Sequence, residues 1–329
     1  MRILVTGASG FLGEQVVARL SVGHIVRATA RRPLQTSRDA AAIEAVQMDL
    51  ADGDLRLLVA DCDAIIHCAA RTAPWGPREL FMRDNVMATR RLLDAAVAAG
   101  TVRRFVQISS PSIYFRWRDA LDLSEDFDLP ACWPTPYAES KWISEQAVLA
   151  ESRLGPVALR PRAVIGAGDR AIVPRIVALA QRGYFPLPGG GRALIDVTCV
   201  DNVVDAIELA LQAPSAAEGR AFNITNGEPM SVRNLLTRLF AALDLPVRLI
   251  SAPRSLANGV ATSLELLARL RRGTEPSVTR YGMGLLAYSQ TLSIDAARST
   301  LGYRPRVSVD EGIRRYAAWR QQFPDQADA

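Results

Sequence analysis

Tyr137 and Lys141 are four residues apart, a spacing that brings two side chains to one face of a helix. Lys141 is the only lysine of the chain, although lysine and arginine together number 39. A free tyrosine has a pKa of about 10, and a neighbouring cation favours the phenolate and lowers that pKa. A compact ammonium can also reach sugar hydroxyls, whereas the planar fork of arginine suits carboxylates and phosphates. The pair therefore predicts a tyrosine that transfers protons near neutral pH with the help of a lysine.

A serine-rich segment, QISSPSIYF, precedes this pair and begins inside a predicted strand over 104–110. Ser109 and Ser110 come where that strand should end, at the carboxyl edge where α/β sheets bind their ligands. We expect the Ser110 hydroxyl to bind a substrate carbonyl, Ser109 to face a cofactor and Ser112 to contact the substrate. The alternative is that these serines only begin a loop ahead of Pro111.

The glycine-rich segment TGASGFLG lies between a predicted strand over 2–6 and a predicted helix over 11–20. Its glycines suit a tight turn, a close approach to a pyrophosphate and the packing of helix on strand. The positive end of the helix would then face the phosphates. A tight turn without a ligand is the alternative. The residues expected to contact the cofactor here are Gly7, Ser9, Gly10, Phe11, Leu12 and Gly13.

The segment TARRP follows the second predicted strand, where an acidic residue would hold the ribose of NAD. Ala30 stands in that place, and Arg31 and Arg32 follow it. A guanidinium can bind a 2′-phosphate through two hydrogen bonds, so NADP is favoured and NAD is the alternative. Both arginines could equally be solvated loop charges. Asp49 is expected to bind the adenine amine or to cap a helix.

The elements that would position these residues alternate between strand and helix, a pattern typical of a doubly wound parallel (Rossmann) sheet. We predict an α/β fold with a dinucleotide-binding domain over 1–161. Residues 162–329 would form mainly a smaller, mixed substrate-binding lobe, part of which returns to the sheet. The further predicted strands are 24–30, 45–48, 64–70, 157–161 and 221–225, and the long helices are 79–99, 137–154 and one from about Ser231.

Composition excludes several classes of function. The net charge is +5 and the pI about 9.3, but the arginines form no basic block, so nucleic-acid binding is not expected. Four cysteines without CxxC spacing and only two histidines argue against a metal site and suit a reducing compartment. The chain has no signal peptide and no apolar run of about 18 residues, which indicates a cytoplasmic protein.

With TGASGFLG, HCAA, DNVMAT, ISSPSIYF and YAESK in this order, the sequence resembles an extended short-chain dehydrogenase/reductase along nearly its whole length. The resemblance implies a catalytic group of Ser110, Tyr137 and Lys141, with Asn85 supporting it. It also implies cofactor contacts from Leu50, Ala69 and Ala70, and from Pro161 and Val164 beside the nicotinamide. The ribose would be held by Lys141, with Tyr137 also in contact with the cofactor.

Within this family, SSPSIYF, AARTAPWG and RPRAVIGAGD resemble the 3β-hydroxysteroid dehydrogenase branch, and most of all its bacterial 2-alkyl-3-oxoalkanoate reductases. Two positions depart from common family patterns. Ala167 replaces the proline of the GPGD sequence that is usual in that segment. Phe115, in SSPSIYF, replaces the glycine that commonly follows the tyrosine of a VYG-type motif. Phe115 is typical of this branch and argues against the sugar-nucleotide enzymes.

The expected reaction is reversible hydride transfer between NADP(H) and a ketone or secondary alcohol. An NAD-dependent sugar-nucleotide epimerase or dehydratase is the alternative enzyme, and a cofactor-sensing regulator is the alternative without catalysis. The substrate should be large and apolar, with Trp75, Trp133, Tyr184 and the helices over 255–290 around it, although each aromatic could equally be core. Residues 255–272 are expected to pack on the lobe rather than on a membrane surface. A homodimer through the helices over 79–99 and 137–154 is expected from the family.

Overall fold

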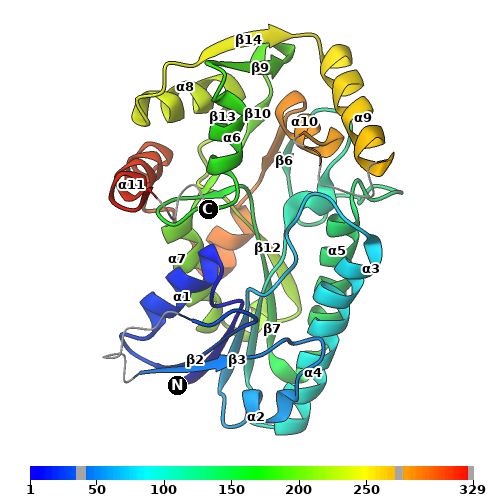
Figure 1. The fold of residues 1–329 in the computed structure, drawn as a ribbon. Coiled ribbons are helices and arrows are strands. Elements are labelled where there is room, and N and C mark those ends of the chain that lie inside the picture. The colour runs from blue at the N-terminus through cyan, green and yellow to red at the C-terminus, as the bar shows by residue number, and fades with distance from the viewer. Residues whose placement is uncertain (35–41, 271–275, 277, 325–329) are drawn as a thin grey trace.

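The structure is a computed structural model that describes residues 1–34, 42–270, 276 and 278–324. A parallel sheet flanked by helices occupies the lower half of Figure 1, and a smaller mixed region occupies the upper half. The predicted α/β architecture is therefore confirmed.

The central sheet has seven parallel strands in the order β12-β7-β5-β4-β1-β2-β3. Ile3, Leu4 and Val5 of the central β1 are fully buried because helices cover both faces of the sheet. The strand order reverses between β1 and β4, and ligands of such sheets bind at the carboxyl ends beside that point. The bounds are Arg2–Thr6 (β1), Ile25–Ala30 (β2), Ile43–Gln47 (β3), Ala64–His67 (β4), Arg104–Ile108 (β5), Pro156–Pro161 (β7) and Arg220–Ile224 (β12).

Helices cover both faces of this sheet (Figure 1), and a separate apolar cluster attaches them to each face. Val17 of α1 and Ile207 of α7 belong to one cluster, and Leu58 of α2, Leu92 of α4 and Val148 of α5 belong to the other. The bounds of these helices are Phe11–Leu20 (α1), Leu55–Val59 (α2), Ala88–Ala99 (α4), Pro136–Leu149 (α5) and Val200–Leu211 (α7).

The long helix predicted over 79–99 is interrupted. It consists of α3 (Arg78–Phe81), a π-helical turn η1 (Met82–Met87) and α4, which ends at Gly100 in a left-handed conformation. The helix predicted over 137–154 ends at Leu149 and is followed by the 3-10 turn η3 (Ser152–Leu154). The strand predicted over 64–70 ends at His67, because the chain there bends past the glycine loop.

The smaller region contains a mixed sheet in the order β13-β10-β15-β6 and two strand pairs, β11-β8 and β14-β9. The helix predicted from about Ser231 is α8, and the Ser231 side chain caps it by accepting a hydrogen bond from the Asn234 N–H at 3.2 Å. The strands are Ala120–Leu123 (β6), Val164–Ile165 (β8), Tyr184–Pro188 (β9), Leu194–Ile195 (β10), Thr198–Cys199 (β11), Met230–Ser231 (β13), Arg248–Ala252 (β14) and Gln290–Leu292 (β15). The helices are Val173–Ala180 (α6), Val232–Ala242 (α8), Arg254–Leu270 (α9), Arg280–Ala287 (α10) and Val309–Gln322 (α11). The remaining short turns of the described chain are Pro111–Tyr114 (η2), Gly189–Gly191 (η4), Ser215–Ala217 (η5) and Ala297–Leu301 (η6), of which η5 and η6 pack against the central sheet.

The helix α9 corresponds to the amphipathic segment predicted over 255–272, of which 271 and 272 lie outside the described residues. Its Ala257 and Ala261 are buried in a small cluster with Met283 of α10. One face therefore packs within the lobe, while Leu256 and Val260 are exposed. Of the helices in the described part of the chain, none has both the length and the apolar character needed to cross a bilayer.

Candidate active site

The glycine loop between β1 and α1 forms a tight cradle at the carboxyl edge of the sheet. Gly7 has a φ of +68°, which favours glycine, and a Cβ there would lie 2.7 Å from the backbone nitrogen of Ala69. A Cβ on Gly13 would collide with the Gly7 carbonyl. No side chain caps the amino end of α1, where Gly10 is the N-cap residue. The loop thus fits a pyrophosphate, which would accept hydrogen bonds from the first N–H groups of α1.

Arg31 and Arg32 follow Ala30 directly after β2, and both are exposed. The Arg31 guanidinium lies 3.2 Å from the carboxylate of Asp84, which also pairs with Arg71 at 2.8 Å. The last residue of β2 is Ala30, so the strand itself ends without a carboxylate, as the sequence indicates. Arg31 is held near the loop after β4 and Arg32 extends toward solvent.

Asp49 and Leu50 follow β3. The Asp49 carboxylate accepts the Ala51 N–H at 2.9 Å and pairs with Arg83 at 3.3 Å. Asp49 thus closes the turn after β3. The N-cap of α2 is Asp54, whose side chain accepts the Arg56 N–H, so the helix-cap alternative for Asp49 is wrong. Leu50 is buried in the apolar cluster beneath. Asp49 is half-buried, so part of its side chain remains exposed to solvent.

The helix α5 begins at Pro136, and the hydroxyl of its N-cap residue Thr135 accepts the Ala138 N–H at 3.1 Å. This start places Tyr137 in the first turn and Lys141 one turn later. The Lys141 ammonium is buried and donates a hydrogen bond to the carbonyl of Ile108, at the end of β5, at 2.5 Å. Burial lowers the pKa of Lys141 to about 8, although the nearby Glu145 carboxylate works in the opposite direction.

Tyr137 is half-buried beside Ser110. Burial raises the pKa of the Tyr137 phenol, and a hydrogen bond with the Ser110 side chain opposes that rise. The expectation that Lys141 brings the pKa of Tyr137 down is therefore wrong for this structure. The physical reason is that burial dominates, while the Lys141 ammonium is directed at the Ile108 carbonyl. The phenol is a protonated acid at neutral pH.

Asn85 lies in the π-helical turn η1, a conformation that often occurs at functional sites. Its side-chain oxygen accepts the Arg71 N–H at 2.6 Å, and its amide donates to the Ser140 hydroxyl at 2.8 Å. Ser140 in turn donates to the Tyr137 carbonyl at 2.8 Å. Asn85 thus joins the loop after β4 to the helix that carries Tyr137, which suits the supporting role predicted for it.

His67, at the end of β4, belongs to a buried network that sequence reasoning missed. Its ring nitrogens lie 2.8 Å from the Thr6 hydroxyl and 2.9 Å from the Thr89 hydroxyl. Burial lowers the pKa of His67 to about 3, and the charge of Lys141 adds to this effect, so the imidazole is neutral. Thr6 also accepts the Ala69 N–H at 3.2 Å, which fixes the strand next to the glycine loop. The position of His67 directly before the CAA segment was the available signal.

The predicted substrate residues do not all gather in one place. Ser112 is buried next to Ser110, donates its N–H to the Ser110 hydroxyl at 3.2 Å and leaves its own hydroxyl without a partner. Trp133 packs against Trp142 of α5 in a small cluster behind η2. Tyr184 is 42% exposed on β9, at the outer part of the lobe. Trp75 is half-buried in the loop after β4.

Other predicted cofactor residues lie along the carboxyl edge of the sheet. Ser109 donates its N–H to the Leu159 carbonyl of β7 at 2.7 Å, and its buried hydroxyl has no partner. Pro161 is buried at the end of β7, and Val164 begins β8. Ala69 and Ala70 are half-buried after β4.

Aromatic residues that the sequence did not single out as a group lie beyond η2. The ring of Phe115 packs against Trp117 and, from α10, Tyr281 at centroid distances of 5.1 and 5.0 Å. Burial raises the pKa of Tyr281, and the neighbouring Tyr137 contributes to that rise. These rings therefore bring apolar surface close to the predicted catalytic tyrosine.

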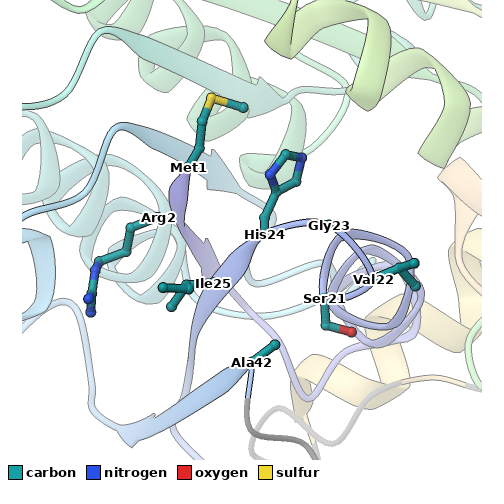
Figure 2. Close-up of a pocket in the computed structure, with 8 residues that line it drawn as sticks. All are labelled: Met1, Arg2, Ser21, Val22, Gly23, His24, Ile25 and Ala42. Atoms are coloured by element: carbon teal, nitrogen blue, oxygen red, sulfur yellow. The ribbon is translucent and has the colours of Figure 1, made fainter.

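The surface hollow in Figure 2 belongs to another part of the molecule. Met1, His24 and Ile25 are among the residues that line it, at the amino ends of β1 and β2. The glycine loop and Tyr137 lie at the carboxyl ends of the strands, so this hollow is not the predicted site. No group of three or more metal-ligating side chains occurs in the part of the chain that the structure describes.

Comparison with known proteins agrees with this arrangement. The profile of the "NAD dependent epimerase/dehydratase family" matches residues 3–225. A 2-alkyl-3-oxoalkanoate reductase of Stenotrophomonas maltophilia is 37% identical, with 97% of this chain and 99% of the relative covered. A mouse sterol-4-alpha-carboxylate 3-dehydrogenase (decarboxylating) is 29% identical, with 95% and 88% covered.

Among solved structures, MoeE5 in complex with UDP-glucuronic acid and NAD is similar over nearly the whole chain. It has a TM-score of 0.77 and 28% sequence identity, and the match covers 98% of this chain and 99% of that one. This chain therefore shares the overall fold of that solved structure.

Proposed function

The chain belongs to the NAD-dependent epimerase/dehydratase family within the extended short-chain dehydrogenases/reductases, and on this premise we propose that it is an NADP(H)-dependent oxidoreductase that interconverts a ketone and a secondary alcohol on an apolar substrate. The observation that carries the proposal is the position of the Tyr137 phenol, which lies beside Ser110 and one helical turn from Lys141 at the edge that holds the glycine loop.

The chain's own residues would handle the oxygen and the proton. Ser110 would donate a hydrogen bond to the substrate oxygen, where negative charge develops during reduction. Tyr137 would protonate that oxygen, and the raised pKa of Tyr137 keeps the phenol protonated at neutral pH. Lys141, held by the Ile108 carbonyl, would donate to ribose hydroxyls. When bound, the nicotinamide cofactor supplies the hydride in reduction and accepts it in oxidation.

The preference for NADP(H) over NAD(H) is supported by the end of β2. Ala30 leaves no carboxylate to repel a 2′-phosphate, and Arg31 and Arg32 are both exposed there. Arg31 already pairs with Asp84, so a 2′-phosphate would compete with that carboxylate for the guanidinium. Arg32 has no such pairing among the described residues and is the stronger determinant.

A second function, sugar-nucleotide epimerisation or dehydration, is favoured by the similarity to MoeE5 with its bound UDP-glucuronic acid and NAD. The aromatic group of Phe115, Trp117 and Tyr281 supports an apolar substrate instead. The two functions differ in a simple observable. An epimerase regenerates its bound cofactor in each turnover, whereas a reductase consumes NADPH.

The test is a panel of 3-oxoacyl, steroid and aryl ketones with NADPH or NADH, followed at the nicotinamide absorbance. Tyr137→Phe should lower kcat/KM by about 10²- to 10⁴-fold because it removes the proton donor. The matched control is Tyr303→Phe, which removes a hydroxyl that bonds the Thr225 carbonyl in the core. Turnover that survives Tyr137→Phe unchanged would contradict the mechanism.

We also propose a homodimer formed through α4 and α5 and a cytoplasmic location. The four cysteines are free, and Cys62 and Cys199 are buried, which suits a reducing compartment. Light scattering after gel filtration would measure the mass directly, and a monomeric mass at micromolar concentration would exclude the dimer.

A further inference from the structure

Arg162 is a buried cation that the proposed mechanism does not use. It follows β7 directly and is 7% exposed. Its guanidinium donates to the side-chain oxygen of Gln290, on β15, at 2.5 Å, while its Nε has no hydrogen-bond partner. No carboxylate among the described residues forms an ion pair with it. A buried guanidinium whose charge and donors are only partly satisfied requires an explanation.

Other polar atoms without hydrogen-bond partners lie near the carboxyl edge of the central sheet, where Arg162 follows β7. The Ser109 and Ser112 hydroxyls, which can donate to an anionic ligand, are buried without partners. One carboxylate oxygen of Asp196 is also buried without a partner, and Asp196 directly follows β10, whose Ile195 pairs with Gln290. Buried polar atoms that lack partners in the protein alone are expected where a ligand supplies the missing bonds.

Arg162 is also connected to the predicted catalytic residues. The amide of Gln290 donates to the Pro111 carbonyl at 3.3 Å, and Pro111 directly follows Ser110. Strand pairing places the ends of β5 and β7 side by side, with Ile108 opposite Leu159, so Ser110 and Arg162 leave the sheet at the same edge. Both Arg162 and Tyr137 influence the pKa of Tyr281, so both lie near that phenol.

We propose that Arg162 binds a carboxylate of the substrate, one carbon removed from the reacting carbonyl, so that the enzyme selects 3-oxo acids over neutral ketones. This inference rests on the proposed function. An arginine fork matches a carboxylate with two parallel hydrogen bonds, and the free Nε with a neighbouring Nη provides such a fork. The names of two similar proteins, 2-alkyl-3-oxoalkanoate reductase and sterol-4-alpha-carboxylate 3-dehydrogenase, describe substrates with a carboxylate in this position.

The competing explanation is that Arg162 only offsets the buried charge of Asp196. Burial raises the pKa of Asp196 and the charge of Arg162 opposes that rise, but the two side chains form neither an ion pair nor a hydrogen bond. The hydrogen bond that Asp196 does make is from the Leu292 N–H, at 2.8 Å. Arg162 is thus free to direct its unused donors elsewhere. If Arg162 only offsets the charge of Asp196, replacing it should lower stability and leave the preference for acid over ester intact. If Arg162 binds the substrate carboxylate, replacing it should remove that preference and leave stability nearly unchanged.

The experiment compares a 2-alkyl-3-oxoalkanoate with its methyl ester, using NADPH and the full chain. Wild-type enzyme should prefer the acid, and Arg162→Gln should lower kcat/KM for the acid by about 100-fold and far less for the ester. Arg162→Lys should recover part of the loss. Arg192→Gln makes the same change on an exposed arginine near β10 and serves as the matched control.

A second measurement separates binding from structure and from failure of the proposed function. Calorimetric titration with a 2-alkyl-3-hydroxyalkanoate and its ester, in the presence of NADP⁺, reads carboxylate binding without turnover. Arg162→Gln should abolish the difference between these ligands while its thermal midpoint stays within about 2 °C of wild type. Equal losses on acid and ester, or an intact acid preference, would overturn the proposal. Wild-type enzyme that reduces neither ketone would count against the proposed function alone, because the titration still tests Arg162.

Discussion

Two arginines at the end of β7, Arg160 and Arg162, are both buried but have different surroundings. Arg160 forms an ion pair with Glu145 of α5 at 2.5 Å, donates to the Tyr114 hydroxyl and stacks on the Tyr114 ring. Arg162 meets the amide of Gln290 and no carboxylate within ion-pair distance among the described residues. The first guanidinium is satisfied within the protein and the second is not.

The difference separates a structural role from a binding role. The Glu145 carboxylate and the Tyr114 hydroxyl raise the pKa of Arg160 against the effect of burial, which means that the fold stabilises its charge. Burial lowers the pKa of Arg162, and Tyr281 and Asp196 oppose this only in part. An anion that bound Arg162 would stabilise the folded state, because it would supply the counter-charge that the protein does not provide.

The largest expected effect concerns the Arg160 cluster. Glu145→Gln should lower the free energy of unfolding by about 3–5 kcal/mol because it leaves a buried guanidinium without its counter-charge. Urea denaturation followed by circular dichroism measures the loss. Glu151→Gln is the matched control, since Glu151 pairs with an exposed arginine, Arg153, and its loss should stay below about 1 kcal/mol. Similar losses in both variants would break the comparison.

A smaller effect is expected for the hydroxyl that Arg160 binds. The Tyr114 hydroxyl also donates to the Asn223 side chain at 3.0 Å, and Tyr114→Phe removes both bonds. The free energy of unfolding should fall by about 1.5–3 kcal/mol. Ser112→Ala, which removes a buried hydroxyl without a partner, should cause no loss in the same assay. If Ser112→Ala is the more damaging change, the unsatisfied atoms have a structural role after all.

The smallest effect concerns Asp196, in the Arg162 cluster. Burial raises the pKa of Asp196, and an acid with a raised pKa binds its proton more tightly in the folded state. Wild-type protein should therefore lose stability as the pH rises from about 4, the unfolded pKa, through the folded pKa. Asp196→Asn removes this dependence, so its stability relative to wild type should rise between pH 4 and pH 7.

Denaturation of both proteins at the two pH values, at one ionic strength, measures this difference. A relative stability of Asp196→Asn that falls with increasing pH would show that the Asp196 carboxylate is stabilised in the fold. Asp196 and Arg162 would then resemble the paired Glu145 and Arg160.

Several features could be predicted because they depend on neighbours in the sequence. The strand, the glycine loop and the helix over 2–20 form one local unit, and the spacing of Tyr137 and Lys141 is set by one helical turn. The interruption of the helix over 79–99 could not be read from its apolar face. The π-helical turn is accompanied by contacts of Asn85 with Arg71 and with Ser140, 55 residues away.

The order of strands and helices, the glycine loop suited to a dinucleotide and the candidate catalytic group could all be predicted from the sequence. The pairing of buried charges could not, because it depends on the tertiary structure. Arg160 and Arg162 are two residues apart, yet their partners come from positions 15 and 128 residues away. The free energy of a buried charge depends on the solvation and counter-charges that the whole fold provides, and these are not local properties of the chain.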